Sequence, residues 1–191
     1  MKKNVFFLVV LSLFVGGFAN AQVKLGANFG LQFPLSINNF VEAKYDMGFG
    51  GNITGEYMVT KNIGTGLGFG FYYLGEIKGH YNYIDHCEPC KGCYDKDITM
   101  MPVTASGYYY FRKKSFKPYA GVELGVYMMR VSYESVYDAE TETHFGFAPV
   151  VGAQYDLFKS FGLNVNLKNN FTSGGTCVTS INIGIVYSFG K

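Results

Sequence analysis

Apolar and polar residues alternate one by one along most of the chain. In Val23–Phe33 every odd position is apolar, while the even positions carry Lys24, Gln32, glycine and asparagine. A repeat of two residues predicts a β-strand with one apolar and one polar face. This run is 11 residues long, which matches the roughly 9–11 residues that a tilted strand needs to cross a membrane.

Seven further segments alternate in the same way, although both faces of Ile98–Phe111 are partly apolar, so we predict about eight strands in all. They are Asp46–Val59, Ile63–Lys78, Ile98–Phe111, Pro118–Tyr133, His144–Asp156, Phe161–Asn169 and Cys177–Phe189. The connections alternate in length: Thr60–Asn62, Arg112–Lys117 and Leu157–Ser160 are short, and those between them are mostly longer. Short periplasmic turns and longer outer loops are typical of outer-membrane barrels. An even number of strands places both termini on the periplasmic side.

The composition of the two faces indicates which one points outward. The polar face consists mainly of glycine, asparagine, serine and threonine with scattered charges, a poor exterior for a soluble barrel but a suitable filling for a narrow interior. The apolar face then meets lipid, where the barrel must close because no backbone group can remain unpaired. We therefore predict an all-β fold, a closed antiparallel up-and-down transmembrane β-barrel of about eight strands. The alternative is a soluble lipocalin-type barrel with its apolar face inside.

Aromatic residues support the membrane interpretation. The chain has 16 Tyr and 18 Phe but no Trp, and many of them gather near the predicted periplasmic turns, where an interfacial girdle is expected. These residues are Tyr57, Tyr109, Phe111, Tyr155, Phe158, Phe161, Tyr187 and Phe189.

The first 21 residues have the pattern of a secretory signal peptide. Lys2 and Lys3 form a basic start, Val5–Phe18 is an uncharged apolar run, and Ala19-Asn20-Ala21 supplies the small residues of a cleavage site. The run is too short for a helical membrane span of about 20 residues. We therefore expect residues 1–21 to be removed during export and residues 22–191 to form one barrel domain in the bacterial outer membrane.

The charge balance argues against one class of partner. Without Lys2 and Lys3, the 16 Lys and Arg residues fall to 14, which equals the 14 Asp and Glu residues. A neutral mature chain gives no electrostatic basis for binding nucleic acid. We therefore expect no nucleic-acid partner.

The signal sequence, the glycine- and aromatic-rich strands and the closing segment Ile181–Phe189 together resemble the small outer-membrane β-barrel family. That family includes OmpA-like, OmpX-like and opacity-type porin-family proteins. The resemblance covers the mature chain, and it implies outer-membrane lipid as surroundings and the barrel-assembly machinery as a partner during biogenesis. It also implies that Phe189, an aromatic residue of the last strand, is part of the signal read by that machinery. In this chain Gly190 and Lys191 follow that residue.

Four charged side chains are predicted to point into the barrel. Lys24, Glu56, Glu123 and Lys168 all occupy polar-face positions, and small barrels fill their interiors with side chains. Because buried charges persist mainly when they are paired, we expect a structural ion-pair network. The alternative is acid–base chemistry by the two confined carboxylates. A filled interior also argues against a general diffusion pore, since wide channels need about 16 strands.

The cysteines form the sharpest local motif of the chain. Cys87, Cys90 and Cys93 lie together in the longest connection, Gly79–Asp97, and Cys177 begins the last predicted strand. An even number of cysteines in a secreted chain favours disulfides, and four cysteines allow three pairings. If all four pair within the chain, Cys177 must join one of the others. The alternative is a zinc site in which a loop histidine adds to the thiolates, but we predict no metal.

The sequence contains no serine motif to accompany its three histidines, as a hydrolase would require. We therefore predict no catalytic residues, no cofactor and no enzymatic activity. The expected function is that of a non-enzymatic surface scaffold that presents its loops for envelope integrity, adhesion or binding of an extracellular partner. The alternative is a small-molecule conduit or a lipid-handling, porin-like barrel.

Overall fold

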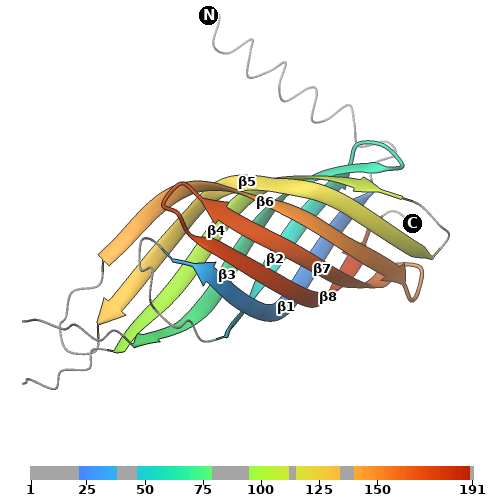
Figure 1. Ribbon diagram of the computed structural model, residues 1–191. Helices are drawn as coiled ribbons and strands as arrows, with labels where there is room; N and C mark the ends of the chain where they lie inside the picture. The colour runs from blue at the N-terminus through green and yellow to red at the C-terminus, as the bar shows by residue number, and fades with distance from the viewer. Residues whose placement is uncertain (1–21, 38–46, 79–94, 112–114, 134–139, 190–191) are drawn as a thin grey trace, which may run out of the picture.

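The chain folds into a single closed antiparallel barrel in the computed structural model (Figure 1). The structure describes residues 22–37, 47–78, 95–111, 115–133 and 140–189. Its strands are β1 (Val23–Ser36), β2 (Gly48–Met58), β3 (Ile63–Lys78), β4 (Asp95–Tyr110), β5 (Phe116–Tyr133), β6 (Glu140–Asp156), β7 (Phe161–Thr172) and β8 (Cys177–Ser188). No helix in these residues is long and apolar enough to cross a membrane. The predicted all-β barrel of eight antiparallel strands is confirmed.

The first and last strands close the barrel. β1 pairs with β8 from Lys24 opposite Ser188 to Ser36 opposite Cys177, with one irregularity after Pro34. All other pairs join strands that follow one another in the chain. The hydrogen-bonded ladder is therefore continuous around the barrel, which a structure surrounded by hydrocarbon requires.

The two ends of the barrel differ. At one end, which we call the turn end, short connections join β2 to β3, β4 to β5 and β6 to β7. At the opposite loop end, β3 to β6 continue past the other strands (Figure 1). Pairing of β2 with β3 stops at Phe49 opposite Tyr73, and pairing of β7 with β6 stops at Thr172 opposite Gly146. We call this extension of β3 to β6, residues 75–78, 95–98, 130–133 and 140–145, the tall wall.

Four strands reach further toward the loop end than the alternation predicts. β1 ends at Ser36 instead of Phe33, and β7 ends at Thr172 instead of Asn169. β4 begins at Asp95 instead of Ile98, and β6 begins at Glu140 instead of His144. In β6 the added residues are polar, and their backbone pairs with β5, for example Thr141 with Arg130. A strand beyond the apolar band needs a pairing partner but no apolar face, so the hydrophobic pattern does not mark these residues.

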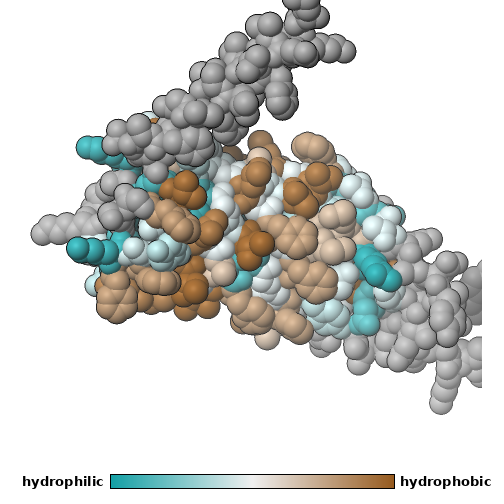
Figure 2. Space-filling model, turned by 180° about the vertical axis from the view of Figure 1, so that it is seen from behind, coloured by the Kyte–Doolittle hydropathy of each residue, from teal (hydrophilic) through white to brown (hydrophobic). Residues whose placement is uncertain are grey.

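The outward face of the barrel is apolar, as the alternation predicts. Phe29, Ile53 and Leu67 all point outward, and Leu67 is 71% exposed. Figure 2 shows brown side chains over the middle of the barrel and teal ones nearer its two ends. Aromatic rings meet at the turn end, where the ring centroids of Tyr187 and Phe189 lie 4.6 Å apart. This exterior suits lipid and does not fit the alternative of a soluble barrel with its apolar face inside.

Candidate functional site in the barrel interior

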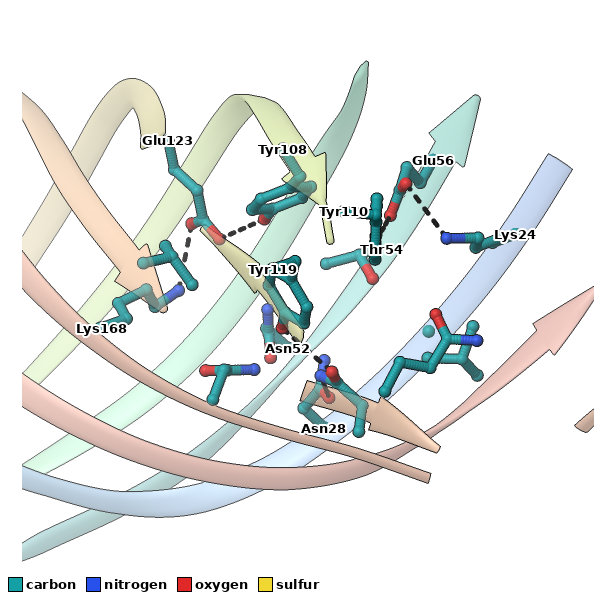
Figure 3. Close-up of a pocket in the computed structure, with 16 residues that line it drawn as sticks. Lys24, Asn28, Asn52, Thr54, Glu56, Tyr108, Tyr110, Tyr119, Glu123 and Lys168 are labelled. Carbon is teal, nitrogen blue, oxygen red and sulfur yellow. Dashed lines mark hydrogen bonds and ion pairs between the residues drawn. The ribbon is translucent and has the colours of Figure 1, made fainter. Parts of the chain in front are cut away.

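The inward-facing side chains form the candidate site. Side chains alternate along each strand, so β1 and β2 place Lys24, Asn28 and Glu56 inside, while β5 and β7 contribute Glu123 and Lys168. Figure 3 shows these side chains converging from different strands. Ion pairs lie in the middle of the interior and toward the turn end, next to a small hydrophobic cluster of Met58, Tyr110, Tyr119 and Val150. A larger hydrophobic cluster lies toward the loop end, where polar side chains are buried as well.

A buried ion pair lies near the middle of the barrel. The Nζ atom of Lys168 is 3.1 Å from Oε2 of Glu123, and the two side chains are only 4% and 6% exposed. Tyr108 donates its hydroxyl proton to Oε1 of the same carboxylate at 2.7 Å, and Lys168 also donates to the hydroxyl of Tyr72 at 3.3 Å. Each charge therefore has a charged partner and a further hydrogen bond, which together offset the loss of water.

A second ion pair lies closer to the turn end. Nζ of Lys24 is 3.4 Å from Oε1 of Glu56 and 3.7 Å from the centroid of the Tyr110 ring. Tyr110 donates its hydroxyl proton to Oε2 of Glu56 at 2.6 Å. The ring thus contacts the cation while its hydroxyl binds the anion, so one tyrosine holds both members of the pair.

A third ion pair contains a residue that the sequence does not single out. Nζ of Lys117 lies 2.5 Å from Oδ2 of Asp156, and Gln154 donates to Oδ1 of that carboxylate at 3.0 Å. The alternation predicts that this strand begins at Pro118 and leaves Lys117 in the preceding connection. In the structure β5 begins at Phe116 and therefore includes Lys117. Lys117 precedes Glu123 by six residues, an even number, so both side chains lie on the same face of the strand. This spacing could have identified Lys117 as inward-facing from the sequence.

Amide side chains occupy the space between the ion pairs. Asn164 donates to Oδ1 of Asn28 at 2.8 Å and accepts a hydrogen bond from Tyr119 at 3.0 Å, while Asn182 donates to Asn166 at 2.9 Å. The cavity among them is about 30 Å³, enough for one or two water molecules. This interior is a packed polar core rather than an open channel.

A cluster of apolar side chains, which we call the apolar plug, lies in the loop-end part of the interior, where Gln32, Asn170 and Ser180 are buried too. Its members are almost completely buried: Ile37, Tyr72, Leu74, Ile98, Met100, Tyr127, Met129 and Val178. They come from β1, β3, β4, β5 and β8 or the residue after them, so the plug spans the barrel. The alternation predicts a polar interior along all strands and therefore does not predict this plug.

The geometry limits what the interior can do chemically. Glu56 and Glu123 each bind a lysine and a tyrosine, so both carboxylates are engaged in the packed core. A general base needs a substrate proton within hydrogen-bond reach, and a cavity of about 30 Å³ leaves no room for an organic substrate. The arrangement links β1 to β2 and β5 to β7 inside the barrel through charged side chains.

The structure brings the four interior candidates together in two pairs, Lys24 with Glu56 and Lys168 with Glu123. Of the four cysteines, the structure describes Cys177, at the loop end of β8, whereas residues 87, 90 and 93 lie outside the described residues. Within the described ranges, no group of three or more His, Cys, Asp or Glu side chains is arranged to hold a metal ion.

The disulfide hypothesis remains a prediction with a direct test. We expect peptide mapping without reduction to link the Cys177 peptide to the peptide containing residues 87–93. A bond of this kind closes a loop of about 84–90 residues and stabilises the fold by about 4–5 kcal/mol in the chain-entropy account. Reduction is then expected to make the loop more sensitive to protease while the barrel stays folded. Four free thiols with bound zinc would contradict this prediction.

Phe189, the residue that the family resemblance connects with barrel assembly, lies directly after β8. Its side chain points outward and packs edge-on against Tyr187, and its backbone N–H donates to the carbonyl oxygen of Val23 at 2.8 Å. The residue therefore lies on the seam between the first and last strands. The signal peptide expected in residues 1–21 lies outside the described residues.

A closed barrel with an apolar exterior and a filled polar interior defines the class of small transmembrane β-barrels. Residues 5–189 match the family model of the outer membrane protein beta-barrel domain. The chain therefore belongs to the outer-membrane β-barrel family, which resides in the outer membrane of bacteria.

Solved structures share this fold at low sequence identity. OprG from Pseudomonas aeruginosa has a TM-score of 0.63 and 17% identity, over 90% of this chain and 97% of that chain. Neisserial surface protein A has a TM-score of 0.60 and 16% identity, over 90% and 98%. Ail, the attachment invasion locus protein of Yersinia pestis, has a TM-score of 0.55 and 14% identity, over 88% and 97%.

One curated sequence is also similar. An uncharacterized protein of Haemophilus influenzae is 30% identical over 88 residues, which are 44% of this chain. The match spans 49% of that protein, about half of its length.

Proposed function

We propose that this protein is a non-enzymatic surface scaffold, in which a non-conducting barrel anchors the loop end for contact with an extracellular partner. The observation that carries the proposal is the filled interior. Three ion pairs and the amide cluster occupy the turn-end half, and the apolar plug closes the loop-end half. A barrel filled in this way serves as a rigid anchor, and its accessible surface lies at its ends.

The tall wall supports a role in surface contact. Longer loops are extracellular in this family of barrels, so the loop end faces outward from the cell. There the wall exposes polar side chains that lie beyond the apolar band, among them Asp97, Arg130 and Thr141. Tyr73 donates to Oδ1 of Asp97 at 2.7 Å, which fixes one of these groups. Two structural neighbours carry names that refer to the cell surface or to attachment, which agrees with this proposal.

Conductance in planar lipid bilayers tests the proposal against the alternative of a conduit. The protein is expected to give no steady current steps, whereas a porin of about 16 strands, used as a positive control, gives them. Steady conductance of the unmodified protein would overturn the proposal and favour the conduit.

A variant of the apolar plug tests, in the same experiment, whether the plug is what prevents ion flow. Tyr72→Ala/Tyr127→Ala removes two rings from the apolar plug and is expected to raise the ion leak above that of the unmodified protein. Tyr109→Ala/Tyr155→Ala removes two outward-facing rings and is expected to leave the leak unchanged. Equal currents from the two variants would show that the apolar plug does not prevent ion flow.

A further inference from the structure

Gln22 is the first residue of the mature chain that the sequence predicts. The expected cleavage site, Ala19-Asn20-Ala21, directly precedes it, so removal of residues 1–21 gives Gln22 a free α-amino group. The backbone of Gln22 is held at the turn end of the barrel, because its carbonyl oxygen accepts a hydrogen bond from the N–H of Met58 at 3.0 Å.

The side chain of Gln22 carries a buried amide nitrogen, Nε2. Among the described residues, this atom has no hydrogen-bond partner. A buried amide donor of this kind costs free energy, because it has lost its hydrogen bonds to water and has gained none in exchange. The same nitrogen is the atom that leaves when an N-terminal glutamine cyclises.

The start of β1 holds two of the interactions that close and fill the barrel. β1 begins at Val23, directly after Gln22, and the carbonyl oxygen of Val23 accepts a hydrogen bond from Phe189 at 2.8 Å, across the seam with β8. The ammonium group of Lys24 lies 3.4 Å from Oε1 of Glu56. An aminopeptidase that removed Gln22, Val23 and Lys24 would therefore remove both interactions.

We propose that Gln22 becomes a pyroglutamate once residues 1–21 have been removed. The α-nitrogen attacks the side-chain carbonyl carbon, Cδ, and the new N–Cδ bond closes a five-membered lactam. The Cδ–Nε2 bond breaks, and Nε2 leaves as ammonia with one proton from the α-amine, so the reaction needs no oxidant or other reactant. An α-amino group has an ordinary pKa of about 7.7–8.0, so part of it is neutral near pH 7 and able to attack.

The product suits the place of this residue in the barrel. Cyclisation removes the buried Nε2 atom and the positive charge of the α-amine, and it leaves the carbonyl oxygen that binds Met58 unchanged. Aminopeptidases require a free α-amine, so the lactam protects the start of β1. The inference rests on the predicted removal of residues 1–21 and is independent of the proposed scaffold function.

Tandem mass spectrometry of peptides from the protein, expressed with residues 1–21 and extracted from the outer membrane, tests the proposal. The N-terminal peptide is expected to begin at residue 22 and to be lighter by one molecule of ammonia. A synthetic isotope-labelled peptide with a free Gln22 amine, carried through the same steps, is expected to stay largely uncyclised. Equal cyclisation of the synthetic peptide would assign the loss to sample handling and overturn the proposal. An uncyclised Gln22 in the protein would overturn it while the predicted cleavage stands, and a different first residue would contradict both.

Two controls show whether the loss of ammonia belongs to the N-terminus. Gln32 also has a buried Nε2 atom without a partner among the described residues, but it lies within β1 and has no α-amine, so its peptide is expected to keep its full mass. Gln22→Asn keeps a side-chain amide but is one methylene too short for the five-membered ring, so this variant is expected to begin with a free amine. After unfolding by heat, an aminopeptidase is expected to shorten the variant but not the wild-type chain. Shortening of the wild-type chain, or a blocked amine in the variant, would overturn the proposal.

Discussion

Replacing Lys168 by methionine is expected to lower the free energy of unfolding of the barrel by about 3–5 kcal/mol. Lys168→Met removes the cation that lies 3.1 Å from the buried carboxylate of Glu123. Methionine has a similar volume, so the loss reports the uncompensated charge rather than a cavity. Urea-induced unfolding in phospholipid vesicles, followed by gel mobility without heating, measures the change.

Two further variants separate charge from packing. Glu123→Gln/Lys168→Met removes both charges and is expected to recover much of the stability, because a neutral pair in a packed interior avoids the cost of a lone charge. Lys159→Met changes an exposed lysine in the turn before β7 and is expected to alter stability by less than about 0.5 kcal/mol. Equal losses for Lys168→Met and Lys159→Met would show that the buried pair has no special role.

Leu67→Arg is expected to destabilise the barrel by about 2–4 kcal/mol. Leu67 lies in the middle of β3 and is 71% exposed on the outward face, so the substitution places a charge in hydrocarbon near the midplane of the membrane. Unfolding in vesicles of defined thickness measures the cost, which is expected to be smaller in thinner bilayers.

Leu157→Arg is the matched control for this position. Leu157 is also exposed but lies in the turn after β6, where a charge reaches the membrane interface and costs about 0–1 kcal/mol. A loss for Leu157→Arg equal to or larger than that for Leu67→Arg would contradict the assignment of the outward face to lipid.

The inward neighbour of Leu67 is less tolerant than the alternation suggests. From the sequence, Gly66→Ser is expected to be milder than Leu67→Arg if the interior has room. A Cβ atom on Gly66 would lie 2.4 Å from the carbonyl oxygen of Gly55, and one on Gly64 would lie 2.0 Å from Oε1 of Glu56. At Gly66 the close atom belongs to the backbone of β2, so close packing requires glycine there, whereas a larger residue at Gly64 would have to displace the side chain of Glu56.

The strands could be predicted because lipid on one side and a narrow interior on the other impose a strict period of two. Val23–Phe33 follows this period throughout, and Ile63–Lys78 follows it as far as Phe71. The bounds of the second segment are the same in the structure. The period fails where a strand leaves the membrane. Glu140–Thr143 are polar on both faces, and they form a strand because β5 supplies backbone partners.

The interior could be predicted only in part. Alternation identifies Lys24, Glu56, Glu123 and Lys168 as inward-facing, but which lysine meets which carboxylate depends on the shape of the closed barrel. The apolar plug could not be predicted from the sequence for a different reason. Tyr72, Met100 and Tyr127 are apolar residues on strands whose outward faces are apolar too, so both faces look alike and the period carries no information there.

The pairing of β1 with β8 also governs how the barrel can form. Lys24 and Ser188 are neighbours across the seam, yet six strands lie between β1 and β8 in the sequence, so this contact is among the slowest to form. A chain that stops before β8 would leave the backbone of β1 and β7 unpaired in hydrocarbon. Partial barrels are therefore poor membrane proteins. The strand synthesised last is the one on which stable insertion of all the others depends.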